Sequence, residues 1–207
     1  MPILSLPTSP NVRSSRIGLV AHTQTFVSPL SRVSQTQEQP GSLWQVTFEY
    51  PPMTRAQAGV WLSFLVKLRG RSGRFYGGDS TYTTPRGVAT GTPLVNGAAQ
   101  IGSTLNTKGW SGPVTGIMLA GDYIAYDVPS GLRQLHLVVA DANSDAGGLA
   151  ALVIEPAIRE SPAADAGIIT SSPTTVMGLV SDDQAAWGID TAQHHGIAFN
   201  ALQELTL

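Results

Sequence analysis

The chain of 207 residues contains no cysteine, which excludes disulfide bonds and thiolate metal sites and fits synthesis in a reducing cytoplasm. Asp, Glu, Lys and Arg make up only 13% of the residues, about half of the usual share of roughly a quarter. The formal net charge of −2 gives no indication of a nucleic acid or an anionic membrane as partner. No apolar run approaches the roughly 20 residues of a membrane-spanning helix. The first residues lack a charged segment followed by an apolar one, so we expect no signal peptide.

What the chain does contain favours β-structure and assembly. Hydrophobic residues make up 42% of the sequence, which is enough for a core. Gly, Pro, Thr and Ser are abundant, and chains of this kind that are also poor in charge are often all-β and covered by neighbouring subunits. The length suits one domain or two small ones, at about 100–200 residues per domain. We therefore expect an oligomer or an assembly subunit rather than a free monomer.

The clearest local signal is a strand over residues 43–50. Apolar and polar side chains alternate along this segment, which is the pattern of a half-buried strand. The apolar side chains are Trp44, Val46, Phe48 and Tyr50. Pro51 and Pro52 end the strand, because proline has no N–H to donate to a neighbouring strand.

A single helix is predicted directly afterwards, over residues 54–69. Thr54 and Gln57 have the spacing of a capping box, Lys67 and Arg69 suit the negative end of the helix dipole, and Gly70 suits the position after the helix. We expect the apolar stripe of this helix to pack on the strand that precedes it. The stripe consists of Ala58, Trp61, Leu62, Leu65 and Leu68.

The rest of the chain reads as short strands, and one domain is predicted to interrupt another. Strand-like runs are expected at residues 16–20, 24–27, 32–37, 116–126, 132–140, 149–155, 175–180, 184–190 and 196–202. Residues 79–115 are dense in Gly, Thr, Pro and Asn and mark a change of character. We predict a first domain formed by residues 1–80 and 160–207 and an inserted β-domain formed by residues 81–159.

One segment has the alternating oxygen ligands of a calcium loop: Asp141, Asn143 and Asp145. The sixth position of this loop is Ala146, where an EF-hand needs Gly, and the twelfth is Leu152, where it needs Glu. Asp, Asn and Gly also form turns, so we interpret residues 141–148 as a hairpin loop between two strands.

The four histidines form no recognisable metal site. His194 and His195 are adjacent, and neighbours in a strand point to opposite faces. His22 and His136 stand alone in strand-like runs. We expect all four to be structural or surface residues, and Asp182-Asp183 to lie in a turn or solvated loop.

Motifs for catalysis and phosphate binding are lacking as well. No Gly-x-Ser-x-Gly elbow and no Gly-x-x-x-x-Gly-Lys-Ser/Thr loop occurs. The best polyanion candidate is the basic cluster of Lys67, Arg69, Arg71 and Arg74, for which we prefer the interpretation of cations at a helix C-terminus beside a partner-facing turn. We therefore predict no catalytic, cofactor-binding or metal-binding residues and no enzymatic activity.

Several segments resemble distal tail and minor tail proteins of siphophages. The resemblance covers roughly residues 40–202 and consists of many small matches. These are Val46 to Ala58 with Trp61, Phe64-Leu65 and Leu68 to Arg71; Pro85 to Ala89; Thr92 to Ala98; Gly109-Trp110; Ala120 to Ile124; Leu135 to Asp141; and Pro156-x-x-Arg159.

The resemblance implies a tail-tube-like β-barrel or sandwich with one packed α-helix and an inserted OB-like β-domain. It implies a virion protein of the tail tip, or baseplate: a ring subunit, usually hexameric, that joins the tail tube to the hub and takes part in tail assembly. The implied partners are copies of the same chain, the tail tube protein and the hub or minor tail proteins. Neither a sequence-specific nucleic acid nor a membrane is expected.

Two alternatives remain open. The first is a host-receptor or carbohydrate-binding module of the tail tip, with Trp110, Tyr123 or Tyr126 as the stacking platform. The second is a cell-wall hydrolase that uses carboxylates such as Asp122 and Asp141, although no acid and base pair occurs at a recognisable spacing.

Overall fold

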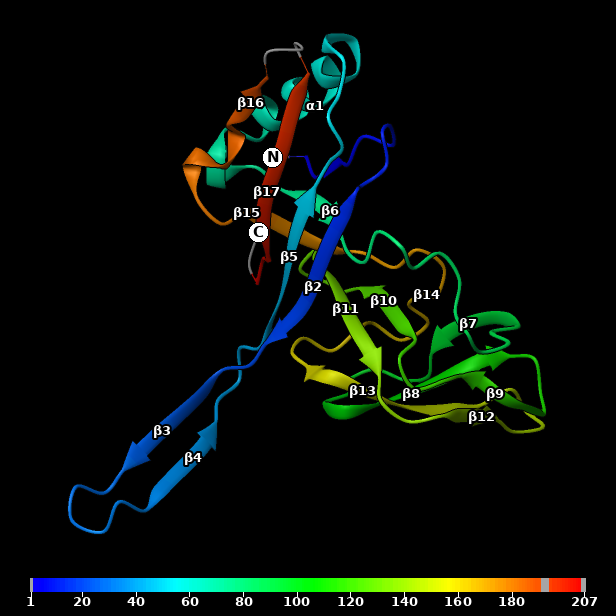
Figure 1. Cartoon of the computed structure of the whole chain (residues 1–207). Helices are drawn as coiled ribbons and strands as arrows, with labels where there is room; N and C mark the ends of the chain where they lie inside the picture. The colour runs from blue at the N-terminus through cyan, green and yellow to red at the C-terminus, as the bar shows by residue number, and fades with distance from the viewer. Residues whose placement is uncertain (1, 191–193, 206–207) are drawn as a thin grey trace.

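The computed structural model describes residues 2–190 and 194–205 (Figure 1). The fold is mainly β, with 46% strand and 10% helical residues, which confirms the predicted class. In chain order the elements are β1 (Leu4–Ser5), β2 (Ser14–Val20), β3 (Thr23–Val27), β4 (Ser34–Glu38), β5 (Leu43–Glu49), α1 (Arg55–Leu68), η1 (Gly70–Ser72), β6 (Phe75–Gly77), β7 (Gly91–Val95), β8 (Gly102–Trp110), β9 (Val114–Met118), β10 (Tyr123–Asp127), β11 (Arg133–Val138), β12 (Ala142–Ser144), β13 (Ala150–Ile158), β14 (Ile168–Ile169), β15 (Thr175–Leu179), η2 (Asp182–Ala185), β16 (Trp187–Ile189) and β17 (His195–Gln203). Within the described residues, no helix is both long enough and apolar enough to cross a membrane.

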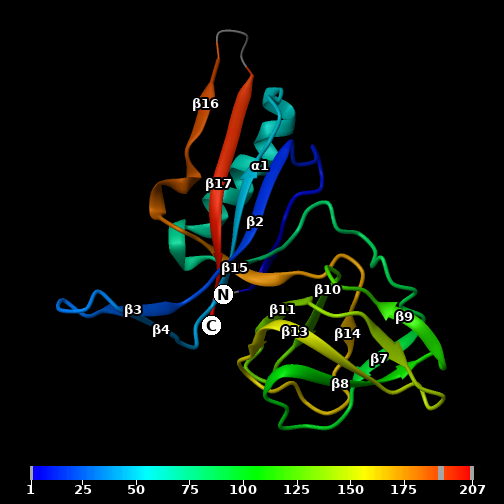
Figure 2. The ribbon, with the colours of Figure 1, turned by 60° about the horizontal axis from the view of Figure 1, so that its bottom comes forward.

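The first sheet carries the helix. Its strands follow the order β1-β6-β15-β17-β5-β2, and β16 pairs with the start of β17. The predicted alternation of β5 is confirmed: its apolar side chains are buried, while Gln45 and Glu49 are exposed. Figure 2 shows α1 lying along the strands of this sheet.

The helix begins and ends where the sequence predicts. The Thr54 N–H donates to Gln57 Oε1 at 3.1 Å, which is one half of the capping box. Arg69 takes the left-handed conformation that ends the helix, and Gly70 follows with a positive φ of 66°.

An aromatic cluster fastens the helix to the sheet. The Trp61 ring lies 3.9 Å from the Tyr50 ring, between centroids, and Phe64 packs on Phe75 at 5.7 Å. Phe75 in turn contacts Phe199 at 6.1 Å, so α1 contacts side chains of β6 directly and those of β17 through Phe75. The predicted stripe is confirmed apart from Leu62, which is only partly buried, whereas Phe64 is buried.

The second sheet closes almost into a barrel. Its order is β14-β10-β11-β13-β8-β7, and its two edges meet where Leu94 bridges to Gly167. The Val95 N–H donates to the Ala166 carbonyl at 2.9 Å and strengthens this closure. A separate pair, β9 and β12, adds to the same block.

The block that contains the second sheet leaves and rejoins the first sheet at one place. Gly77 at the end of β6 lies opposite Thr175 at the start of β15, so residues 78–174 have adjacent ends. Because β14 pairs with β10, the second sheet extends beyond residue 159. The two sheets also pack on each other: the Trp44 indole N–H donates to the Leu135 carbonyl at 2.8 Å.

Three local expectations differ from the structure. The run expected over residues 116–126 is broken into β9 and β10 by a turn in which Gly121 has a φ of 97°. The run expected over residues 184–190 begins as the 3-10 helix η2 before it becomes β16. Strands β7 and β8 lie in the Gly-rich stretch of residues 79–115, for which no strand is predicted.

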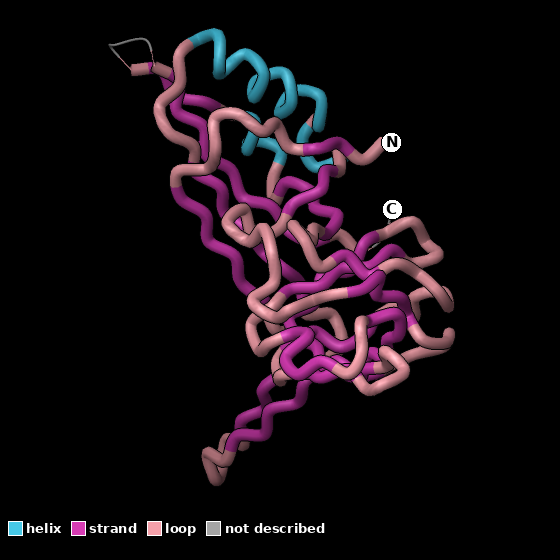
Figure 3. Tube along the Cα trace, turned by 90° about the vertical axis from the view of Figure 1, so that its right-hand side faces the viewer, coloured by secondary structure: helices cyan, strands magenta, loops and turns pink. Residues whose placement is uncertain are grey.

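Strands β3 and β4 form a hairpin that projects away from both sheets, and we call residues 22–39 the hairpin arm (Figures 1 and 3). The arm continues the antiparallel pair of β2 and β5, in which Val20 lies opposite Leu43. The Gln39 N–H donates to the His22 carbonyl at 2.7 Å and joins the two ladders. Arm and helix lie at opposite ends of the molecule in both views.

Candidate assembly surface

The side chains of the calcium-like segment, residues 141–145, accept hydrogen bonds from backbone N–H groups. Asp141 Oδ1 accepts from the Ala120 N–H at 2.8 Å, and Asn143 Oδ1 accepts from the Gly116 N–H at 2.7 Å. Asp145 Oδ1 accepts from the N–H groups of residues 147 and 149 at 2.8 and 2.9 Å. The contacts of Asp145 are those of a turn, whereas Asp141 and Asn143 bind the segment around β9. The predicted simple hairpin loop is wrong, because residues 142–144 form β12 and pair with β9.

The described part of the chain holds no group of three or more His, Asp and Glu residues arranged for a metal ion. His194 is exposed and its Nδ1 lies 3.6 Å from Asp190 Oδ2, whereas His195 is buried. The two neighbouring rings therefore do not share an environment. His22 Nδ1 lies 3.1 Å from the Pro40 carbonyl at the base of the hairpin arm.

His136 is a buried structural residue. Its Nδ1 lies 2.7 Å from the Pro156 carbonyl, and since a carbonyl only accepts, Nδ1 carries the proton. Its ring stacks on Tyr126 at 5.1 Å. Burial lowers the pKa of His136 to about 4, the Pro156 carbonyl raises it, and the positive charge of Arg159 lowers it further.

Some donors of the basic cluster are already bound by neighbouring residues. Arg74 Nη2 lies 3.3 Å from Glu204 Oε2, and Arg74 Nη1 donates to the Arg71 carbonyl at 2.7 Å. Asp182 accepts from the Arg71 N–H at 2.9 Å, which places an acidic residue beside the cluster. These contacts lie within the turn that follows the helix, and the interpretation of cations beside a partner-facing turn stays a prediction.

The two carboxylates considered for hydrolysis also bind backbone groups. Asp122 is fully buried and accepts from the N–H groups of Arg86, Gly87 and Leu119 at 2.7, 3.0 and 2.8 Å. Asp141 accepts from Ala120, as described above. Each carboxylate therefore holds a loop of the block that contains the second sheet.

The three rings considered for glycan stacking do not form an exposed platform. Trp110 and Tyr126 are buried in the core of the second sheet. Tyr123 is partly buried, and it packs between Trp44 and Tyr82 at ring distances of 5.7 and 5.3 Å. The faces of these rings pack against other side chains of the protein.

The hairpin arm is the most exposed apolar surface of the described chain. Every residue of β3 and β4 is exposed. The apolar side chains of the hairpin tip, which we define as residues 26–33, remain between half and almost fully exposed. They are Phe26 (67%), Val27 (54%), Leu30 (96%) and Val33 (61%).

Such an arm gains little from its own chain. A two-stranded ribbon is marginally stable in water, because it has no face to bury. Both of its outer edges also present unpaired N–H and C=O groups, which are templates for pairing with another strand. Arg32 is the only charged side chain between residues 23 and 37, so little charge protects these edges.

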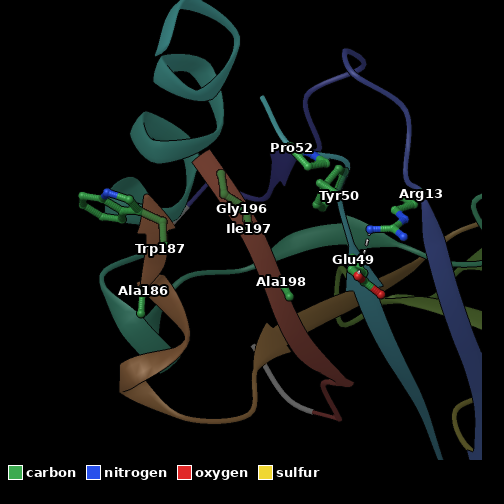
Figure 4. A pocket seen from close by; sticks show the side chains of 10 residues that line it. Arg13, Glu49, Tyr50, Pro52, Ala186, Trp187, Gly196, Ile197 and Ala198 are labelled. Atoms are coloured by element: carbon green, nitrogen blue, oxygen red, sulfur yellow. Dashed lines mark ion pairs between the residues drawn. The ribbon is translucent and has the colours of Figure 1, made fainter. Parts of the chain in front are cut away.

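A groove lies at the other end of the first sheet and has a volume of about 400 Å³ (Figure 4). Gly196 and Ala198 of β17 form its floor, and Trp187 stands on one side. Tyr50 and Pro52 lie on the opposite side, together with Arg13 and Glu49, whose side chains lie 3.8 Å apart. We call this depression the Trp187 groove. Trp187 remains 43% exposed.

Sequence reasoning missed both surfaces as sites. It predicted strands in the arm but did not mark them as exposed on both faces. The available signal was the run of Gln, Thr and Ser with one charge, which contrasts with the half-buried alternation of residues 43–50. The Trp187 groove depends on the pairing of β16 with β17, which no local sequence pattern predicts.

A scan against models of protein families finds no match to this chain, and a search of curated protein sequences finds no significant match. We therefore infer function from the surfaces described above and from the resemblance of the sequence segments.

Proposed function

We propose that the chain is a structural subunit of a phage tail tip. In this proposal several copies form a closed ring at the distal end of the tail tube, with the tube protein on one side and the hub on the other. The chain contributes shape and contacts rather than chemistry.

The observation that carries the proposal is the hairpin arm. A ribbon with four exposed apolar side chains at its tip and two open edges is a liability in a free monomer. In an assembly, a neighbouring chain covers these groups and closure of the ring removes open edges. The low charge of the chain lowers the desolvation cost of such contacts.

Three further observations support the proposal. The mainly β fold with one packed helix agrees with the architecture that the resemblance implies. The residues considered for catalysis and glycan stacking are occupied by contacts of the fold itself. The near-neutral net charge also suits a ring through which DNA passes, because a strongly basic lumen would retain it.

Two measurements test the proposal. Light scattering on the purified chain should give a mass of several copies, and six times 21.7 kDa for a hexamer. Cryo-electron microscopy of the phage particle with this chain labelled should show the label in one layer between tube and hub. Label on the capsid, along the whole tube or nowhere on the particle would refute it.

A further inference from the structure

We infer that the hairpin tip of one copy docks into the Trp187 groove of a second copy of this chain. The inference rests on the proposed ring for its geometry. It goes further in naming the two surfaces that meet and the side chains that join them.

The first step is that the arm cannot reach its own groove. Arg13 and Glu49 line the groove beside the Ser14–Glu49 end of the β2–β5 pair, whereas the arm leaves the Val20–Leu43 end. Seven residues of strand separate the two ends, a span of about 23 Å at roughly 3.3 Å per residue. The arm then extends farther away (Figure 1). A contact between tip and groove therefore joins two molecules.

The second step is complementary chemistry. The tip offers Leu30 and Val33 with the cation of Arg32 between them. The groove offers the exposed ring of Trp187 and the half-exposed carboxylate of Glu49, which already lies 3.8 Å from Arg13 of the same wall. An apolar contact of this kind, with an ion pair at its rim, is the usual composition of a protein interface.

The third step is the charge of the surrounding segments. The hairpin tip, residues 26–33, carries the cation of Arg32 and no carboxylate, whereas Glu38 lies at the base of the arm. The groove is lined by one carboxylate, Glu49, and one cation, Arg13. A second carboxylate, Asp190, directly follows β16 and lies 3.6 Å from His194. Opposite charges favour this pairing over a contact between two arms, where Arg32 would meet Arg32.

The fourth step is the symmetry of the contact. Arm and groove are different surfaces at opposite ends of one sheet, so the contact is heterologous. Repeated head to tail, such a contact produces a ring when the rotation closes. Among the described residues, β16 pairs with β17 alone, so its other edge is available to a strand of the arm.

The absence of cysteine makes a direct test possible. Leu30→Cys and Gly188→Cys are made as separate proteins, mixed and mildly oxidised. A Cβ at Gly188 would meet nothing within 4 Å, so the second substitution leaves the groove intact. A disulfide forms only where two Cα atoms approach to about 4–7 Å. We expect a mixed dimer on a non-reducing gel, where a size tag on one variant separates it from the two homodimers.

The matched control replaces Leu30→Cys by Ile101→Cys, an exposed side chain of the second block (81% exposed). The tip variant should cross-link at least about tenfold more than this control, because docking raises the effective concentration of the two thiols. Equal cross-linking of both variants would overturn the inference.

A charge exchange gives an independent test. Arg32→Glu and Glu49→Arg should each weaken self-association about tenfold in sedimentation experiments, and the double variant should restore it. Far-ultraviolet circular dichroism checks that each variant is folded. A double variant no tighter than the single ones, or a wild-type chain that stays monomeric at every concentration, would refute the docking. If the chain forms a closed ring but neither the cross-link nor the charge exchange gives the expected result, the docking is refuted while the proposed function still holds.

Discussion

Trp61→Ala tests whether the aromatic cluster fastens the helix to the first sheet. Trp61 is 1% exposed, packs on Tyr50 and Phe64, and donates its indole N–H to the Ser9 carbonyl at 3.0 Å. Removing a buried Trp side chain costs about 3–5 kcal/mol, and the lost hydrogen bond adds about 1 kcal/mol. We therefore expect the free energy of unfolding to fall by about 4–6 kcal/mol.

Urea unfolding followed by tryptophan fluorescence and circular dichroism measures this loss. Val60→Ala is the matched control, because Val60 lies in the same helix and is more than half exposed. It should cost less than about 0.5 kcal/mol. Trp61→Phe keeps most of the packing but loses the bond to Ser9, so it separates the two contributions. A loss below about 1 kcal/mol for Trp61→Ala would mean that the ring is not packed as described.

Three further predictions concern the second sheet and its attachment. Burial lowers the pKa of His136 from its ordinary value of 6.5 to about 4 in the folded chain. As the pH falls, the unfolded chain therefore binds the proton at a higher pH than the folded chain does. Stability should therefore fall by about 3 kcal/mol as the pH drops from 6.5 to 4, and His136→Gln should remove this slope in urea titrations at several pH values. Asp122→Asn turns an amide NH₂ toward backbone donors that both carboxylate oxygens now accept from, and it should cost about 3 kcal/mol. Asp141→Asn keeps an oxygen that can accept from the Ala120 N–H, so it should cost less than about 1 kcal/mol, and thermal melts compare the two. Replacing residues 78–174 by a short Gly/Ser linker should leave a folded first sheet, because Gly77 and Thr175 are adjacent, and insoluble product would show that both sheets need one core.

The parts of the fold that the sequence predicts are those that bury one face against their own chain. Residues 43–50 alternate because one face of β5 packs under the helix, and the helix carries its cap residues at Thr54 and Gly70. Local signals of this kind need no knowledge of distant residues. They were sufficient to predict the strand, the helix and their contact.

The parts that the sequence does not predict depend on distant partners. β8 is nine residues long, but its Gly, Thr and Asn residues give no strand pattern. It forms a strand because it pairs with β13 on one side and β7 on the other. The extension of the second sheet to β14 depends on a two-residue pairing with β10. The role of Asp122 depends on loop N–H groups about 35 residues earlier in the chain.

The hairpin arm reveals a limit of a different kind. Alternation along a strand reports the face that is buried within one chain, and the arm has none. The arm is nevertheless predicted as a strand, because Thr, Phe26 and Val27 favour an extended backbone. Under the proposal, a strand-forming segment with no buried face of its own is stabilised by a neighbouring molecule. The arm is therefore the place where a single sequence gives the least information about packing, and under our proposal it is also where the function lies.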